Sequence, residues 1–100
     1  MTPEAKVKAY FKKCCKEWGF IAVPLRPATG FKGWPDYTVL IDNTGKTAFV
    51  EVKEAKANMN KKHVKEQSEM LQTLRGKGHF AEFAIGKEGV DACVKKMLAL

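Results

Sequence analysis

Two carboxylates and a lysine occur in this chain in a pattern that could hold a divalent cation. Asp36 directly follows Pro35, and after a short segment Glu51 and Lys53 flank a single valine, Val52. Carboxylate oxygens are the ligands that hard cations such as Mg²⁺ and Mn²⁺ prefer. A lysine beside them could offset negative charge that develops on a phosphate. Whether these side chains meet depends on how the intervening segment folds.

That segment has the pattern of a β-hairpin. Residues 37–41 and 47–50 are rich in β-branched and aromatic side chains, and residues 42–46 between them have the composition of a turn. A two-residue turn would place Asp36 opposite Glu51, with Cβ atoms roughly 5 Å apart. A longer loop with a glycine bulge would shift the pairing by about one residue.

In the first of these registers two like charges face each other, which is destabilising unless a cation lies between them. Strand alternation adds that Glu51 and Lys53 share one face, while Val50 and Val52 point the other way into apolar packing. The pattern therefore predicts a metal site with a lysine beside it. The alternative is a solvated turn acid, an exposed strand acid and an ordinary edge-strand lysine.

Further motifs extend this pattern over most of the chain. They are Gly33-Trp34-Pro35-Asp36, Glu51-Val52-Lys53, and Gln67 followed by Leu71, Leu74 and Gly78. Together they resemble the PD-(D/E)xK nuclease superfamily and, more narrowly, its virus-type replication-repair branch, the VRR-NUC domain. The resemblance implies metal-dependent cleavage of DNA phosphodiesters, often in branched substrates. By resemblance to stand-alone viral relatives, we also expect a phage or bacterial origin.

The resemblance assigns roles to individual residues. Asp36 and Glu51 would be ligands of Mg²⁺ or Mn²⁺, and the backbone carbonyl of Val52 would be a further ligand. Lys53 would help to position the attacking water and offset charge on the phosphate. The number of metal ions, one or two, stays open.

Gln67 is an amide on a helical stripe that otherwise faces inward, with His63, Met70, Leu71 and Leu74. A buried amide needs hydrogen-bond partners, which a water at the metal or the Glu51–Lys53 strand could supply. The resembled family places its glutamine there. The alternative is a glutamine at the edge of the core.

Glu4 shares a helical stripe with Val7 and Phe11, so it could reach the site from the first helix, as a glutamate does in many relatives. The alternative is an acid that simply favours the first turn of a helix. For His63, we favour a surface position over a phosphate contact. For Trp34 and Phe31, we favour packing of their loop against the sheet over stacking on an unpaired base.

The formal net charge of +7 favours a polyanionic partner. Lysine supplies nearly all of it, since Arg26 and Arg75 are the only arginines. Lysine acts as a point charge on phosphate, whereas reading of bases favours arginine, so we expect recognition of DNA backbone and shape. The alternative is a solvated basic surface. The candidate DNA-contacting residues are Arg26, Lys32, Lys56, Lys61 and Lys62.

The order of expected elements is α-β-β-β-α-β-α, in one domain spanning residues 1–100. Such an α/β (α+β) chain predicts a restriction-endonuclease-like core, with a mixed sheet flanked by helices. Thr2 would cap the first helix, whose buried face would comprise Val7, Tyr10, Phe11, Cys14 and Trp18. Asn58 or Asn60 would cap the second helix. The remaining expected elements are strands at 20–25, 37–41, 47–50 and 80–85, the second helix to about Arg75, and a closing helix marked by Val90, Val94, Met97 and Leu98.

Three cysteines, two of them adjacent, form no disulfide framework, and no apolar run approaches the roughly 18 residues of a membrane span. We therefore expect a cytoplasmic protein, in a bacterial cell or a phage-infected host, without a membrane segment or a secretory signal. Small size and family analogy predict a homodimer acting on branched DNA such as a Holliday junction. The alternatives are a basic module that binds nucleic acid without cutting it, and a protein-interaction domain.

Overall fold

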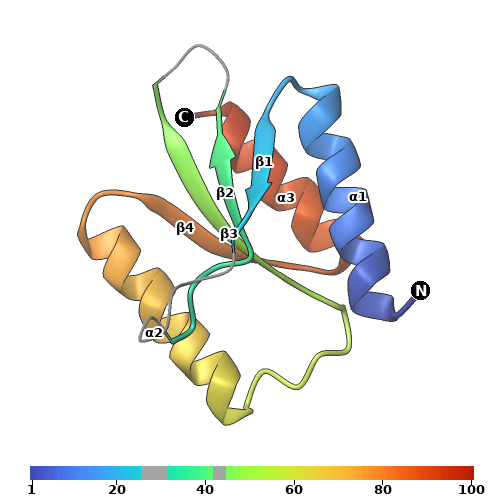
Figure 1. The fold of residues 1–100 in the computed structure, drawn as a ribbon, viewed down its shortest axis with the longest axis vertical. Helices are drawn as coiled ribbons and strands as arrows, with labels where there is room; N and C mark the ends of the chain where they lie inside the picture. Colours follow the sequence, from blue (N-terminus) through green and yellow to red (C-terminus); the bar gives the residue numbers. More distant parts are fainter. Residues whose placement is uncertain (26–31, 42–44) are drawn as a thin grey trace.

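A four-stranded mixed sheet lies between helices in the computed structural model of this protein, which describes residues 1–25, 32–41 and 45–100 (Figure 1). The expected order α-β-β-β-α-β-α is confirmed. The elements are α1 (Pro3–Glu17), β1 (Ile21–Pro24), β2 (Tyr37–Leu40), β3 (Thr47–Lys53), α2 (Lys62–Gly76), β4 (Phe80–Ile85) and α3 (Gly86–Leu98).

The strands lie in the order β1-β2-β3-β4, antiparallel except for the parallel pair β3 and β4. Between β2 and β3, Thr38 pairs with Phe49 and Leu40 pairs with Thr47. This is the register without a bulge, and one step beyond Tyr37 it sets Asp36 opposite Glu51. The turn residues 42–44 that would produce it lie outside the described residues.

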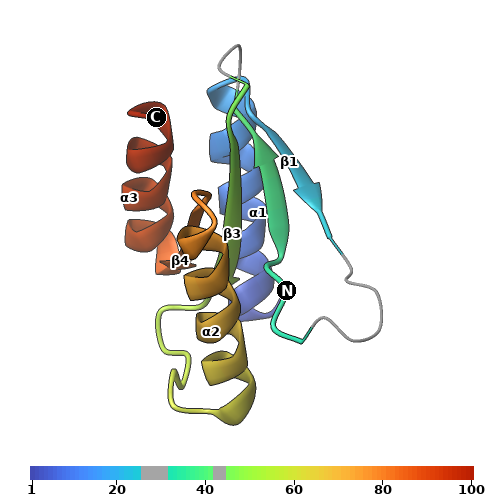
Figure 2. The ribbon, with the colours of Figure 1, turned by 90° about the vertical axis from the view of Figure 1, so that its left-hand side faces the viewer.

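Helices α1 and α3 pack together on one face of the sheet, and α2 packs on the other (Figure 2). Successive side chains of β3 point to opposite faces of the sheet. Val50 and Val52 join the larger core beneath α1 and α3, as predicted, while Phe49 lies in the smaller cluster beneath α2. Since side chains alternate along a strand, Glu51 and Lys53 share the α2 face with Phe49.

The buried face of α1 differs from the prediction in three residues. Val7, Phe11 and Cys15 are buried, whereas Tyr10 and Cys14 are only partly buried and Trp18 is 56% exposed. Cys15 lies four residues after Phe11 and continues its row down the helix. Trp18 is the C-cap, beyond the last helical residue Glu17, so its side chain leaves the stripe. The cap at the other end is as predicted, because Thr2 Oγ1 accepts from the backbone N–H of Ala5 at 3.1 Å.

The start of α2 was also predicted wrongly. Its N-cap is Lys61, which makes no side-chain capping bond. Asn58 instead closes a turn before the helix, where its Oδ1 accepts from the N–H of Asn60 at 3.0 Å. Leu98 at the end of α3 is exposed, although Val90, Val94 and Met97 are buried as expected. Among helices of the described residues, none is long and apolar enough to cross a membrane.

Candidate active site

The C-terminal end of β3 extends beyond β2 and carries two charged side chains into the protein. Glu51 is 2% exposed and Lys53 is 6% exposed. Charged side chains are almost never buried to this extent unless they are paired. The alternative of an exposed strand acid and an edge-strand lysine is therefore wrong. β4 pairs with β3 over this whole stretch, up to Lys53, and so removes the edge.

The two oxygens of Glu51 have different surroundings. Its Oε2 accepts from Nε2 of Gln67 at 3.2 Å and lies 3.7 Å from Nζ of Lys53. Its Oε1 is buried and has no hydrogen-bond partner among the described residues, and the same holds for Oε1 of Gln67. A buried acceptor without a partner costs free energy, so these atoms mark a place where a ligand would be stabilising.

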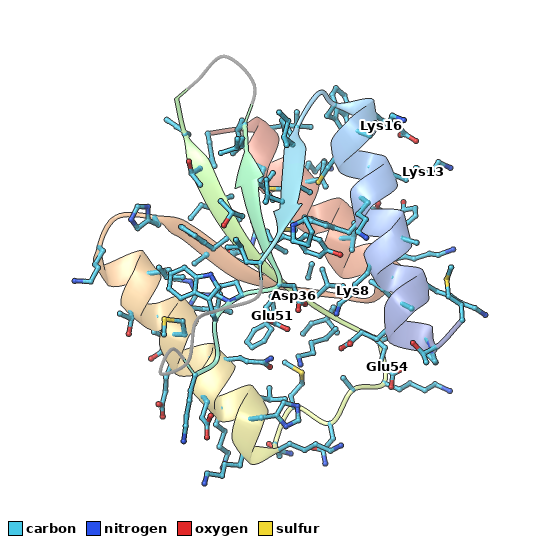
Figure 3. The ribbon with its side chains drawn as sticks, in the orientation of Figure 1. Lys8, Lys13, Lys16, Asp36, Glu51 and Glu54 are labelled. Carbon is cyan, nitrogen blue, oxygen red and sulfur yellow. The ribbon has the colours of Figure 1, made fainter. Side chains whose placement is uncertain are left out.

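Asp36 reaches the same point from the chain before β2. Its Oδ2 accepts from the N–H of Val52 at 2.9 Å. The N–H and C=O of one strand residue point to the same side, so the carbonyl of Val52 is directed toward Asp36 as well. The second carboxylate oxygen of Asp36, Oδ1, lies 3.6 Å from Nζ of Lys8 on α1. Figure 3 shows Asp36, Glu51 and Lys8 close together near the centre of the molecule.

The pKa of Glu51 is raised to about 8. Burial is the largest cause, and the neighbouring Asp36 carboxylate is the next. Lys53 and Lys8 act in the opposite direction but are outweighed. Partial burial opposes the charge on Lys8, yet Asp36 and Glu4 outweigh it, so the pKa of Lys8 is raised. Burial and the neighbouring carboxylate thus disfavour the charged form of Glu51, and a further cation beside it would favour that form.

Gly33 joins the Asp36 segment to α2. Its φ is +75°, and a Cβ placed on it would lie 2.5 Å from the backbone oxygen of Glu66 and 2.8 Å from the backbone nitrogen of Gln67. Only glycine allows this approach without strain. The segment is further anchored because Pro35 is fully buried and the ring of Trp34 packs edge-on to that of Phe49, with centroids 5.8 Å apart. This is the packing predicted for Trp34.

Glu4 lies close to the carboxylate pair but is not among its contacts in the described residues. Its Oε2 pairs with Nζ of Lys8 at 3.5 Å. It also lines a pocket of about 390 Å³ between the N-terminal ends of α1 and α2, with Lys53, Asn58, Lys61 and His63. Lys8 was not among the residues that the sequence predicted for the site. The available signal was its position four residues after Glu4, on the same side of the helix.

The other predicted residues are spread around the site. Lys61 and His63 are exposed and line the pocket that contains Lys53. His63 lies at the surface, as favoured, and Val64 is the buried residue at the start of α2, while Leu71 and Leu74 are buried as the predicted stripe requires. Lys32, Lys56 and Lys62 are exposed and are not among the residues that line this pocket. Arg26 and Phe31 lie outside the described residues.

The donor set of the site fits a hard divalent cation. The described residues contain no group of three or more His, Cys, Asp and Glu side chains arranged to hold a metal. The available oxygens are instead the carboxylates of Asp36 and Glu51 and the backbone carbonyl of Val52. Oxygen donors are those that Mg²⁺ and Mn²⁺ select, and Oε1 of Glu51 has no other partner.

Comparison with known proteins identifies a solved structure of similar fold. No family model matches the sequence, and no curated protein matches it. A solved structure described as a VRR_NUC domain superposes with a TM-score of 0.77 at 27% sequence identity, covering 95% of this chain and 97% of that chain. The resemblance that the sequence motifs predicted is therefore confirmed over nearly the whole chain, which folds as a VRR-NUC domain.

Proposed function

We propose that this protein is a metal-dependent endonuclease that hydrolyses DNA phosphodiester bonds. The VRR-NUC match supports a nuclease family. The observation that carries the proposal is the unpartnered, buried Oε1 of Glu51 beside Asp36, with Lys53 and Gln67 on its other oxygen. A binding surface would have no use for a buried carboxylate oxygen without a partner, because it costs stability.

The proposed cofactor is Mg²⁺ or Mn²⁺, held by Asp36, Glu51 and the carbonyl of Val52. A divalent cation held there would supply an activated water and positive charge beside the scissile phosphate. Lys53 would hold Glu51 in place and add positive charge at the same point, in a buried setting where charge interacts strongly. Gln67 would orient Glu51 through its Nε2 and present its free Oε1 to a water.

DNA would approach along the pocket between the N-terminal ends of α1 and α2. Lys61 and His63 line that pocket together with Lys53, and the chain has a formal net charge of +7. Lysines at these positions would bind phosphates without reading bases. Lys32, Lys56, Lys62 and Arg26 are further candidate phosphate contacts.

For the substrate we propose branched DNA, such as a Holliday junction, cut by a homodimer. Each copy of the domain contributes one pair of carboxylates, Asp36 and Glu51, to a site. Two copies would bring two sites to two strands of a junction. Light scattering tests this part: a monomeric mass at concentrations where cleavage is intact would rule out the dimer.

The test of the activity is incubation with end-labelled linear, flap and four-way-junction DNA in Mg²⁺, Mn²⁺ or EDTA. Asp36→Asn and Lys53→Met should abolish cleavage, whereas the exposed Lys77→Met, at the far end of α2, should not. Binding without cleavage under every condition would overturn the nuclease and favour a non-catalytic nucleic-acid-binding module.

For the compartment we propose the cytoplasm. All three cysteines are free in the described residues, and burial raises the pKa of both Cys15 and Cys93 to about 12. Buried thiols that stay protonated are compatible with a reducing compartment.

A further inference from the structure

Lys8 lies between two acids at the edge of the proposed metal site. Its Nζ is 3.6 Å from Oδ1 of Asp36 and 3.5 Å from Oε2 of Glu4. Its side chain is 33% exposed, so the ammonium group is partly shielded from water. Lys13 and Lys16 on the same helix lie farther from Asp36 and point away from the protein (Figure 3). Lys8 is therefore different from Lys13 and Lys16.

The two carboxylates of the site differ in what a metal ion would have to displace. Glu51 offers Oε1, which has no partner among the described residues. Asp36 offers no such atom, since Oδ2 accepts from the N–H of Val52 and Oδ1 is paired with Lys8. A divalent cation that binds both carboxylates would therefore compete with Lys8 for Oδ1. Two cations at one carboxylate oxygen also repel each other.

We propose that Lys8 is a positioning residue that holds Asp36 in the metal-free protein and is displaced from it by the metal ion, with Glu4 retaining the displaced ammonium group. This inference rests on the proposed function, because it concerns the same site. It gives Glu4 a role different from that of a metal ligand. Glu4 lies one helical turn from Lys8 and already contacts it, so Lys8 can leave Asp36 without losing its other partner.

Removal of Lys8 should tighten metal binding, because the competing charge is gone. The interaction of two unit charges a few ångströms apart changes an affinity by about 5-fold in bulk water and by more in a partly hydrated site, so we expect a change of about 5-fold or more. Isothermal titration of the metal-free protein with Mn²⁺, without DNA, measures this directly. Lys8→Met should lower the dissociation constant by that factor. Lys13→Met removes the same charge from an exposed position of α1. Its dissociation constant for Mn²⁺ should stay within about 1.5-fold of that of the original protein.

A substitution of Glu4 should change the affinity for Mn²⁺ in the opposite direction. In Glu4→Gln, Lys8 loses its second partner and stays on Asp36, so Mn²⁺ binding should weaken. Once Lys8 is absent, Glu4 has no ammonium group to retain. The double variant Glu4→Gln/Lys8→Met should therefore bind Mn²⁺ nearly as tightly as Lys8→Met alone. An effect of Glu4→Gln that is undiminished in the Lys8→Met background would mean that Glu4 acts on the metal directly, and would overturn the proposal.

The remaining outcomes of the Mn²⁺ titrations test the role of Lys8 and the metal site separately. An original protein that binds Mn²⁺, with Lys8→Met unchanged or weaker, overturns the role of Lys8 and leaves the metal site standing. An original protein that binds no Mn²⁺ overturns both. Lys8→Gln is a second neutral variant in case Lys8→Met fails to fold, as judged by circular dichroism. Lys8→Arg, which keeps the charge, should bind Mn²⁺ as the original protein does.

Discussion

Nε2 of Gln67 donates to Oε2 of Glu51 at 3.2 Å, which links the middle of α2 to the buried end of β3. The bond occupies one oxygen of the carboxylate and leaves the other, Oε1, without a partner. Gln67 thus holds Glu51 through one oxygen and leaves the other without a partner among the described residues. Groups that orient a metal ligand in this way contribute to metal affinity and activity although they do not touch the metal.

Gln67→Leu should lower DNA cleavage by about 10- to 100-fold, because Glu51 loses its orienting donor. The melting temperature should change by only a few degrees, since Gln67 lies at the border of the core. Gln72→Leu, an exposed glutamine on the same helix, is the control and should leave cleavage unchanged. Equal cleavage by both variants would contradict the role of Gln67.

Glu51→Gln should remove the stabilisation that a metal ion provides while leaving the metal-free protein folded. A ligand at 100 times its dissociation constant stabilises a protein by about 2.7 kcal/mol, which raises the melting temperature of a domain this size by roughly 10 °C or more. We expect this rise with Mn²⁺ for the original protein and for Glu69→Gln, an exposed acid on α2. Thermal unfolding in Mn²⁺ and in EDTA measures it; a full rise in Glu51→Gln would exclude Glu51 as a ligand.

Gly33→Ala should destabilise the fold by about 2–4 kcal/mol, because the new Cβ would meet the backbone of Glu66 and Gln67 and the φ is positive. Gly76→Ala is the matched control. A Cβ at Gly76, the last residue of α2, meets nothing within 4 Å, so this change should be neutral or stabilise by up to about 1 kcal/mol. Urea unfolding followed by tryptophan fluorescence measures both, and equal midpoints would show that the close approach is unimportant.

Lys61→Ala should weaken DNA binding equally for all sequences, because Lys61 would contact phosphate in the pocket beside Lys53. The slope of log K against log salt concentration should become shallower by about 0.9 if one phosphate contact is lost. Lys77→Ala, at the C-cap of the same helix, should keep the original slope. Fluorescence anisotropy at several salt concentrations, in EDTA to prevent cleavage, provides the comparison.

The thiols should react in two classes. Burial raises the pKa of Cys15 and Cys93 to about 12, so at pH 8 roughly one in ten thousand of each is the reactive thiolate. Cys14 is only partly buried. A colorimetric disulfide reagent should label one thiol quickly in the native protein and three in denaturant. Raising the pH toward 10 should speed the slow class, because its thiolate fraction rises about tenfold for each unit below the pKa. Rapid labelling of all three in the native protein would contradict the burial of Cys15 and Cys93.

Much of the fold follows from local pattern. The helical period of Val7 and Phe11, the capping by Thr2 and the β-branched runs at 37–41 and 47–50 led to the observed order of elements. The sequence left two hairpin registers open, and the structure has the one that sets Asp36 opposite Glu51 and keeps Val50 and Val52 in the core. These features depend on neighbours in sequence or on strands joined by a short turn, which a sequence pattern reports directly.

The sequence by itself therefore determined which residues could form the site: Asp36, Glu51, Lys53 and Gln67 carry suitable chemistry at suitable positions. Only the tertiary structure decided their surroundings. The burial of Glu51 depends on β4 and α2, the place of Gln67 depends on the contact of Gly33 with α2, and the pairing of Lys8 with Asp36 joins two elements distant in sequence. Such contacts arise from tertiary packing, which leaves no periodic signal in the chain. The spacing of Lys8 and Glu4 indicates their own pairing, but only the folded protein shows that Lys8 reaches Asp36.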